Sequence, residues 1–307
     1  MCESILTTNQ LTKKYRNHLA LDAIHINIKK GDIYGFIGQN GAGKSTLLRL
    51  ITGLAAPTRG TIALFGNDNP KALTDAQKRI GAIIESPALF PTMTARENLE
   101  VHRLQKGVPG KACIDKTLEL VGLTDTGNKK VKNFSLGMKQ RLGLAIALLS
   151  DPEFLILDEP TNGLDPMGIV ELRKLIQKLN KEKGLTVLIS SHILSELHQL
   201  ATKYGIIHNG KLLEELTANE LDDQCRQHLR IKVDQPTSAT TVLEKELTTT
   251  DFEVMPDGTI KLYQYLEDVR KVSKALTDNQ LIIEHLSQNG DSLESYFTSL
   301  IGGADRD

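Results

Sequence analysis

Residues 38–46 restrict the fold of this chain more than any other stretch of its sequence. They read Gly-Gln-Asn-Gly-Ala-Gly-Lys-Ser-Thr and fit the phosphate-binding pattern G-x-x-x-x-G-K-[ST]. The apolar run Ile33–Ile37 before them predicts a buried strand, and apolar residues at helical spacing follow them as far as Leu54. Strand, glycine-rich loop and helix in this order predict a phosphate site at the helix N-terminus.

Each residue type in this loop suits a nucleoside triphosphate. Glycines let successive backbone N–H groups turn toward the β- and γ-phosphates without a Cβ clash. Lys44 supplies a mobile cation, and the Ser45 hydroxyl can bind Mg²⁺. The residues expected to bind ATP are Gly38, Asn40, Gly41, Ala42, Gly43, Lys44, Ser45 and Thr46.

The rest of the first two thirds of the chain predicts an α/β domain. Continuous apolar runs at 154–157 and 186–189 are typical of parallel strands covered on both faces. Asn209-Gly210 between two apolar runs predicts a hairpin that closes the domain. Between about 86 and 150 the signals are helical, and Thr94 resembles a capped helix start. We therefore expect residues 1–216 to form a P-loop NTPase domain with a helical insertion at about 86–150.

Beyond residue 217 the pattern restarts and predicts a second, small α+β domain. Apolar periodicity indicates strands at 229–233 and 281–286 and helices at 238–247, 266–276 and 293–300. A hairpin is expected across Pro256, Asp257 and Gly258. The order β-α-β-β-α-β predicts a ferredoxin-like accessory domain at 217–307.

Charge and composition exclude several classes of protein. The 307 residues carry 37 Lys plus Arg against 38 Asp plus Glu, so a net charge of −1 argues against a nucleic-acid partner. Cys2, Cys113 and Cys225 lie far apart and form neither a disulfide framework nor a metal-binding pattern, which fits a reducing cytoplasm. No run approaches the roughly 18 apolar residues of a spanning helix, and no secretory signal is expected.

Two adjacent carboxylates follow the apolar run at 154–157. Asp158 can hold Mg²⁺ there, and Glu159 can act as a general base or orient an attacking water. Phosphoryl transfer needs mainly positioning and charge neutralisation, and these two roles require both residues. Downstream of a phosphate loop, the pair predicts hydrolysis of the bound nucleotide.

The segment at 134–141 predicts a helix whose N-terminus can approach a phosphate. Ser135 is a good N-cap, and Gly137 permits close approach to the first N–H groups. This segment resembles the signature sequence of ABC ATPases and stands just before the Asp158-Glu159 strand, as it does in that family. The resemblance implies that Ser135 and Gly137 close on ATP held by a second subunit, either a copy of this chain or a homologous one.

Further segments resemble ABC ATPase motifs in the family's order. Asp165, in Asn162-Gly163-Leu164-Asp165, resembles the D-loop aspartate, which contributes in trans. His192 resembles the catalytic switch histidine of the family. The expected catalytic residues are therefore Glu159, His192 and Lys44. Tyr15 resembles the aromatic residue that stacks on adenine. The resemblance implies ATP and Mg²⁺ as ligands.

One position departs from the common family pattern. Glu85 stands where most ABC ATPases carry the glutamine of the Q-loop, and a carboxylate offers only acceptors and a negative charge near Mg²⁺. We expect Ser45, Asp158 and Glu85 to form the metal site. The glutamate and the following Ser-Pro segment resemble the subgroup that exports bacitracin or confers lantibiotic immunity. Residues 292–297 resemble the closing helix of such exporter subunits.

The leading hypothesis is the ATPase subunit of an exporter of peptide antibiotics. It would sit on the cytoplasmic side of the membrane, bound to separately encoded transmembrane permease chains. An exporter of lipid or polysaccharide, a non-transport soluble ABC ATPase and a module that has lost hydrolysis are alternatives. The last conflicts with Lys44, Asp158, Glu159 and His192, which are all present.

Overall fold

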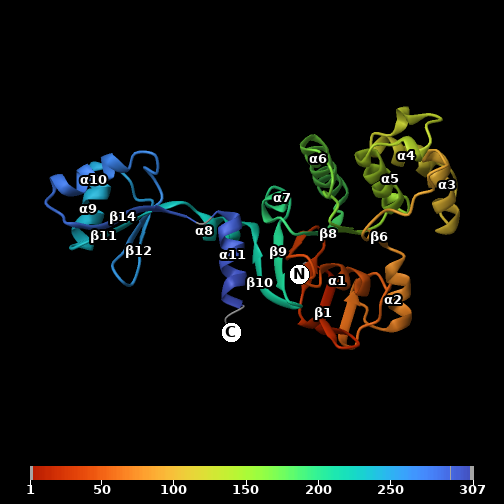
Figure 1. Cartoon of the computed structure of the whole chain (residues 1–307), viewed down its shortest axis with the longest axis horizontal. Helices are drawn as coiled ribbons and strands as arrows, with labels where there is room; N and C mark the ends of the chain where they lie inside the picture. The colour runs from red at the N-terminus through yellow and green to blue at the C-terminus, as the bar shows by residue number, and fades with distance from the viewer. Residues whose placement is uncertain (1–2, 291, 305–307) are drawn as a thin grey trace. The chain divides into compact units, whose positions relative to one another are not determined.

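A computed structural model describes residues 3–290 and 292–304 (Figure 1). The chain divides into two compact units, Met1–Ala218 and Asn219–Gly303. Cys2 lies outside the described residues, and Cys113 and Cys225 are thiols rather than a disulfide. Among the helices that the structure describes, none has the length and apolar character required to cross a membrane.

A six-stranded sheet forms the centre of the first unit, in the spatial order β10-β9-β4-β8-β7-β6. Its strands are β4 (Ile33–Ile37), β6 (Ile80–Ile83), β7 (Phe154–Asp158), β8 (Thr186–Ser191), β9 (Lys203–His208) and β10 (Lys211–Thr217). All but β10 run parallel, so the carboxyl ends of β4, β7 and β8 meet at one edge. β10 returns antiparallel to β9 through Asn209-Gly210, both at positive φ, which confirms the predicted hairpin.

A second, antiparallel sheet belongs to the same unit. Its strands are β1 (Ser4–Tyr15), β2 (His18–Ile24), β3 (Asn27–Lys29) and β5 (Arg59–Leu64). Helix α1 (Lys44–Ile51) contributes four apolar side chains to one core shared with both sheets. Helix α2 (Pro70–Gln77) follows β5 and adds Ala76 to this core. The start of α1 is therefore held firmly against the end of β4.

Helices α3, α4 and α5 form the insertion and share a separate apolar core (Figure 1). The helical segments between β6 and β7 are α3 (Ala95–Gln105), α4 (Ala112–Leu120), the 3₁₀ turns Thr124–Thr126 and Val131–Asn133, and α5 (Leu136–Leu148). Thr94 and Glu97 form a reciprocal capping box at α3, as predicted. Helices α6 (Pro166–Lys183) and α7 (Leu194–His198) follow β7 and β8.

The second unit contains a four-stranded antiparallel sheet in the order β12-β13-β11-β14. Its elements are β11 (His228–Val233), α9 (Pro236–Glu246), β12 (Phe252–Val254), β13 (Ile260–Leu262), α10 (Val269–Asp278), β14 (Ile283–Asn289) and α11 (Leu293–Ala304), after α8 (Ala218–Cys225) at the boundary. Apolar residues of α9 and α10 form one core with β11 and β13.

The bounds of several elements in the second unit differ by one to four residues from those expected, and two of these differences follow from particular contacts. The helix expected from residue 266 begins at Val269, because the Asp268 side chain accepts a hydrogen bond from Lys271 N and caps it there. The strand expected at 281–286 runs from Ile283 to Asn289 and pairs with β11 along that length. The predicted order of strands and helices is otherwise confirmed.

Candidate active site

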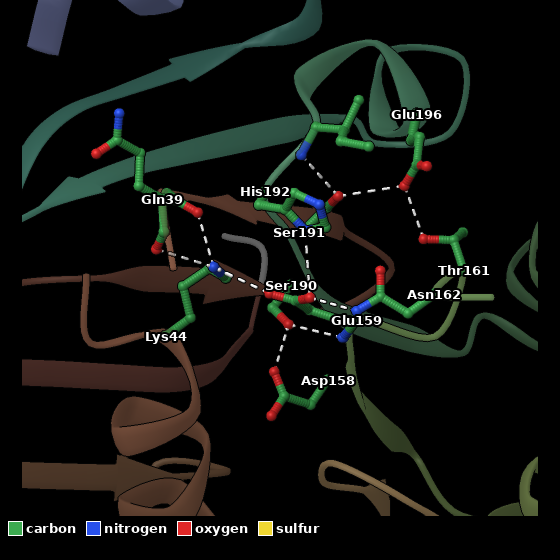
Figure 2. Close-up of polar contacts among 12 residues, drawn as sticks. Gln39, Lys44, Asp158, Glu159, Thr161, Asn162, Ser190, Ser191, His192 and Glu196 are labelled. Carbon is green, nitrogen blue, oxygen red and sulfur yellow. Dashed lines mark hydrogen bonds and ion pairs between the residues drawn. The ribbon is translucent and has the colours of Figure 1, made fainter. Parts of the chain in front are cut away.

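The phosphate loop lies between β4 and α1, and Lys44 is the first residue of that helix. Lys44 is only 5% exposed, and its Nζ donates to the backbone oxygens of Gly38 at 2.7 Å and Gln39 at 3.2 Å (Figure 2). Gly43, the N-cap, has φ +112°, and a Cβ there would lie 2.6 Å from Ala20 O. Both its backbone conformation and its packing therefore require glycine.

A pocket of about 280 Å³ opens in front of this loop. It is lined by Tyr15, His18, Ala20, Asn40, Gly41, Gly43, Lys44, Ser45, Thr46 and Glu159. The structure thus brings the predicted aromatic residue, most of the predicted loop residues and the predicted general base to one cavity. Two further loop residues, Gly38 and Ala42, support it, since Gly38 O anchors Lys44 and Ala42 is packed in the core.

The two carboxylates at the end of β7 have different surroundings. Asp158 is 4% exposed, and its Oδ1 accepts a hydrogen bond from the Ser190 hydroxyl of β8 at 2.6 Å. The same hydroxyl oxygen accepts from Glu159 N at 2.9 Å. Glu159 has φ +45°, a strained conformation for a residue with a side chain. Ser190 therefore fixes both carboxylates from the neighbouring strand.

The Glu159 carboxylate is the centre of the site in Figure 2. Its Oε1 lies 3.0 Å from Lys44 Nζ, and its Oε2 lies 3.2 Å from His192 Nδ1 and 2.5 Å from Asn162 Nδ2. Burial alone would raise the pKa of Glu159, but hydrogen bonds from Lys44 and Asn162 and the Lys44 charge outweigh it and lower the pKa below its usual value. The carboxylate is thus kept deprotonated and able to accept a proton.

The oxygen donors of the site can be compared with the ligands that Mg²⁺ binds. Among the described residues, no group of three or more His, Cys, Asp or Glu side chains could hold a metal ion. Mg²⁺ does not need such a group, because it keeps several waters and binds one or two protein oxygens plus substrate phosphates. The Ser45 hydroxyl in the pocket and the buried Asp158 carboxylate are oxygen donors of that kind, so these residues fit Mg²⁺.

The residues expected to act in trans lie elsewhere. Ser135, Gly137 and Asp165 line a second pocket of about 820 Å³, formed by α4, α5, α6 and the loop before α6. Ser135 caps α5 by accepting from Met138 N at 3.3 Å, and Asp165 caps α6 by accepting from Gly168 N at 2.8 Å. The two pockets share no lining residue. One chain therefore holds the two predicted halves of the site apart.

Glu85 lies outside the lining of both pockets. Its backbone has φ +64°, its side chain is 61% exposed, and its carboxylate forms an ion pair with Arg49 on α1. The structure therefore groups this carboxylate with the helix that follows the phosphate loop. Its role as a ligand of Mg²⁺ stays a prediction.

Several polar partners were not foreseen from the sequence. Asn162 and Ser190 hold the two carboxylates, and the Gln39 carbonyl helps to hold Lys44. Asn162 stands in the segment that predicted Asp165, and Ser190 stands just before Ser191-His192, so both lay next to a recognised motif. The Asp158 partner of Ser190 could not be predicted, because it lies 32 positions away. Asn162 is only three positions from Glu159, and a backbone hydrogen bond from Asn162 N to Glu159 O forms the turn that brings their side chains together.

The chain is similar to known proteins along nearly all of its length. The family model described as ABC transporter matches residues 21–162. The bacitracin transport ATP-binding protein BcrA of Bacillus licheniformis is 47% identical over 98% of this chain and 98% of its own length. The lantibiotic transport ATP-binding protein SrtF of Streptococcus pyogenes is 46% identical over 69% of this chain and 90% of its own. A dimeric bacterial ABC transporter cassette is similar in structure, with TM-score 0.63 and 27% identity over 69% of this chain and 98% of its own.

Proposed function

The chain belongs to the ABC transporter family as an ATP-binding ATPase subunit, and on that premise we propose that it powers export of peptide antibiotics of the bacitracin or lantibiotic type. The observation that carries the substrate class is the similarity to BcrA along 98% of both chains, because it includes the second unit as well as the ATPase. Export of lipid or polysaccharide has no comparable support.

In the proposed reaction, ATP occupies the 280 Å³ pocket with its adenine against Tyr15. Its phosphates lie on the loop N–H groups, and Lys44 exchanges its backbone acceptors for phosphate oxygens. Glu159 accepts the proton of the attacking water, while His192 donates a hydrogen bond to the developing charge. The contacts among Lys44, Glu159 and His192 support this assignment, because they place cation, base and imidazole together.

Mg²⁺ would be held by Ser45 and Asp158, with the remaining positions taken by water and phosphate oxygens. Bound there, it would neutralise charge on the phosphates during transfer. Ser190 keeps the Asp158 carboxylate in place through its 2.6 Å hydrogen bond. Glu85 would complete the metal site only after leaving Arg49.

The complete site is proposed to need two chains, copies of this one or a homologous pair. The separation of the two pockets supports this, since Ser135, Gly137 and Asp165 cannot line the ATP pocket of their own chain in this arrangement. The dimeric cassette of similar structure supports it as well. A second chain would bring those three residues to the γ-phosphate from the opposite side.

Transport requires membrane-spanning partners, so the chain would act on the cytoplasmic face of the membrane, bound to permease chains. The second unit is proposed to be a ferredoxin-like accessory domain covering 217–307, in addition to the ATPase domain at 1–216. Its strand order β12-β13-β11-β14 and its β-α-β-β-α-β sequence support this assignment.

The two-chain site is tested by mixing Lys44→Ala and Ser135→Arg subunits. Each homodimer lacks an intact composite site, whereas the heterodimer regains one, so ATPase activity should reappear on mixing. Wild-type activity in the Ser135→Arg homodimer would contradict the composite site. The substrate class is tested by comparing bacitracin and lantibiotic resistance of cells that express wild type or Glu159→Gln together with the permease chains that co-purify. Equal resistance in both strains would overturn the export proposal.

A further inference from the structure

A third carboxylate, that of Glu196 on α7, contacts the segments that follow Glu159 and precede His192. Glu196 Oε2 accepts a hydrogen bond from the Thr161 hydroxyl at 2.7 Å and another from the Ser191 hydroxyl at 3.3 Å (Figure 2). A single oxygen atom thus receives both hydroxyls. The Ser191 oxygen also accepts from Ile193 N at 3.0 Å, which continues the chain of hydrogen bonds to the start of α7.

These contacts join the two segments that carry the proposed catalytic groups. Thr161 is two residues beyond Glu159, across Pro160, and Ser191 directly precedes His192. We propose that Glu196 is a positioning residue that locks the segment after Glu159 to the segment before His192 and so sets the distance between the two side chains. The inference rests on the roles proposed above for Glu159 and His192.

The burial of the two hydroxyl groups makes this connection strong. Thr161 is 8% exposed and Ser191 is 2% exposed, so water cannot readily replace Glu196 as their partner. An ionised carboxylate only accepts hydrogen bonds, which fixes the direction of both contacts. Without Glu196, both segments lose their common anchor.

The geometry of Glu159 makes it sensitive to that anchor. Its positive φ of 45° is a strained conformation, and such conformations persist only when the surroundings fix the backbone on both sides. Ser190 holds Glu159 N on one side, and the Thr161–Glu196 contact holds the chain on the other. The 3.2 Å contact between Glu159 and His192 is already long, so a small displacement would break it.

The proposal is tested with full-length Glu196→Ala and Glu196→Gln. We expect Glu196→Ala to lower kcat for ATP hydrolysis about tenfold or more, because small misplacement of reacting groups has effects of that order, while KM for ATP changes by less than about twofold. Glu196→Gln should recover most of the activity, because one carbonyl oxygen can accept both hydroxyls. Ser195→Ala, at the exposed neighbouring position on α7, is the matched control and should behave as wild type.

Thr161→Val gives an independent check in case Glu196→Ala folds poorly. It should also lower kcat, and the double variant should be no more impaired than Glu196→Ala, because Glu196→Ala already removes the contact with Thr161. Additive losses, equal losses in Glu196→Ala and Glu196→Gln, or wild-type kcat in Glu196→Ala would overturn the proposal. Glu159→Gln is assayed alongside. If Glu159→Gln retains full turnover, the proposed catalytic roles are wrong. If Glu159→Gln is inactive and Glu196→Ala is fully active, only the positioning role of Glu196 is wrong.

Discussion

The two units of this chain differ in whether charged side chains are buried. In the first, Lys44 and Asp158 are buried and bonded to neighbours at the carboxyl edge of a parallel sheet. In the second, the buried polar side chains that the structure describes are two threonines, Thr249 and Thr259, and the charged ones are exposed or half-buried. Burying a charge is costly unless it is well bonded. Buried charge therefore coincides with the proposed catalytic site.

Sheet type explains part of the difference. Parallel strands need crossover connections, and these bring loops from distant parts of the sequence to one edge, where ligands bind. In the antiparallel sheet of the second unit, β11 alternates, with Leu229, Ile231 and Val233 buried and Arg230 exposed. That alternation forms a core and an outer face, and among the described residues of the second unit it gathers no charged groups into a buried cluster.

The largest effect is expected for Glu159→Gln. It removes the proposed base but spares the phosphate loop, so ATPase turnover should fall about a hundredfold or more while ATP binding persists. ATP and Mg²⁺ should then hold the variant as a dimer, detected by gel filtration. Lys261→Gln in the second unit also changes one charge, but its side chain faces outward on β13, and turnover should match wild type.

Two results would remove this contrast between the units. A comparable loss in Lys261→Gln would show that the second unit takes part in hydrolysis. A Glu159→Gln chain that stays monomeric with ATP and Mg²⁺, while wild type hydrolyses ATP, would contradict the shared site.

The features that could be predicted from the sequence were those determined locally. The phosphate loop, the Thr94 cap and the Asn209-Gly210 turn each depend on residues a few positions apart, and the structure has all three. The side-chain partners could not be predicted in this way. Arg49 lies 36 positions from its partner Glu85, and Glu196 lies 35 positions from its partner Thr161. Thr161 and Glu196 meet because the segments that follow the adjacent parallel strands β7 and β8 leave the sheet at the same edge.

An intermediate effect, on stability rather than catalysis, is expected for Ile231→Val. Ile231 is fully buried in the core of the second unit, and removal of one methylene should lower its free energy of unfolding by about 0.5–1.5 kcal/mol. Calorimetry should show the transition of that unit moved down by a few degrees, with ATPase turnover unchanged. Arg230→Ala, at the next and exposed position, should change stability by less than about 0.5 kcal/mol. A single calorimetric transition for the whole chain, moved down in Ile231→Val, would show that the two units unfold as one.

Glu85→Gln is expected to have only a small effect on hydrolysis, and it tests an exposed charge of the first unit against the buried ones. Glu85 and Arg49 are 61% and 39% exposed, and ion pairs of this kind contribute at most about 1 kcal/mol. If burial determines which charges act in the chemistry, basal ATPase of Glu85→Gln at saturating Mg²⁺ should stay within about threefold of wild type. We expect export by the full complex to fall further than ATPase, because Glu85 precedes the helical insertion that would face the permease.

Arg49→Gln is the matched control for this last comparison, since it breaks the same ion pair and leaves the carboxylate in place. If Glu85 acts by binding Mg²⁺, Glu85→Gln should lose ATPase and Arg49→Gln should keep it, because a neutral amide binds a hard cation less well than a carboxylate. If Glu85 acts through Arg49 on α1, both variants should keep ATPase and lose export together. If ATPase falls in proportion to export in Glu85→Gln but not in Arg49→Gln, the exposed Glu85 carboxylate acts as a ligand of Mg²⁺. Exposure would then no longer distinguish the charges that act in hydrolysis from those that link hydrolysis to export.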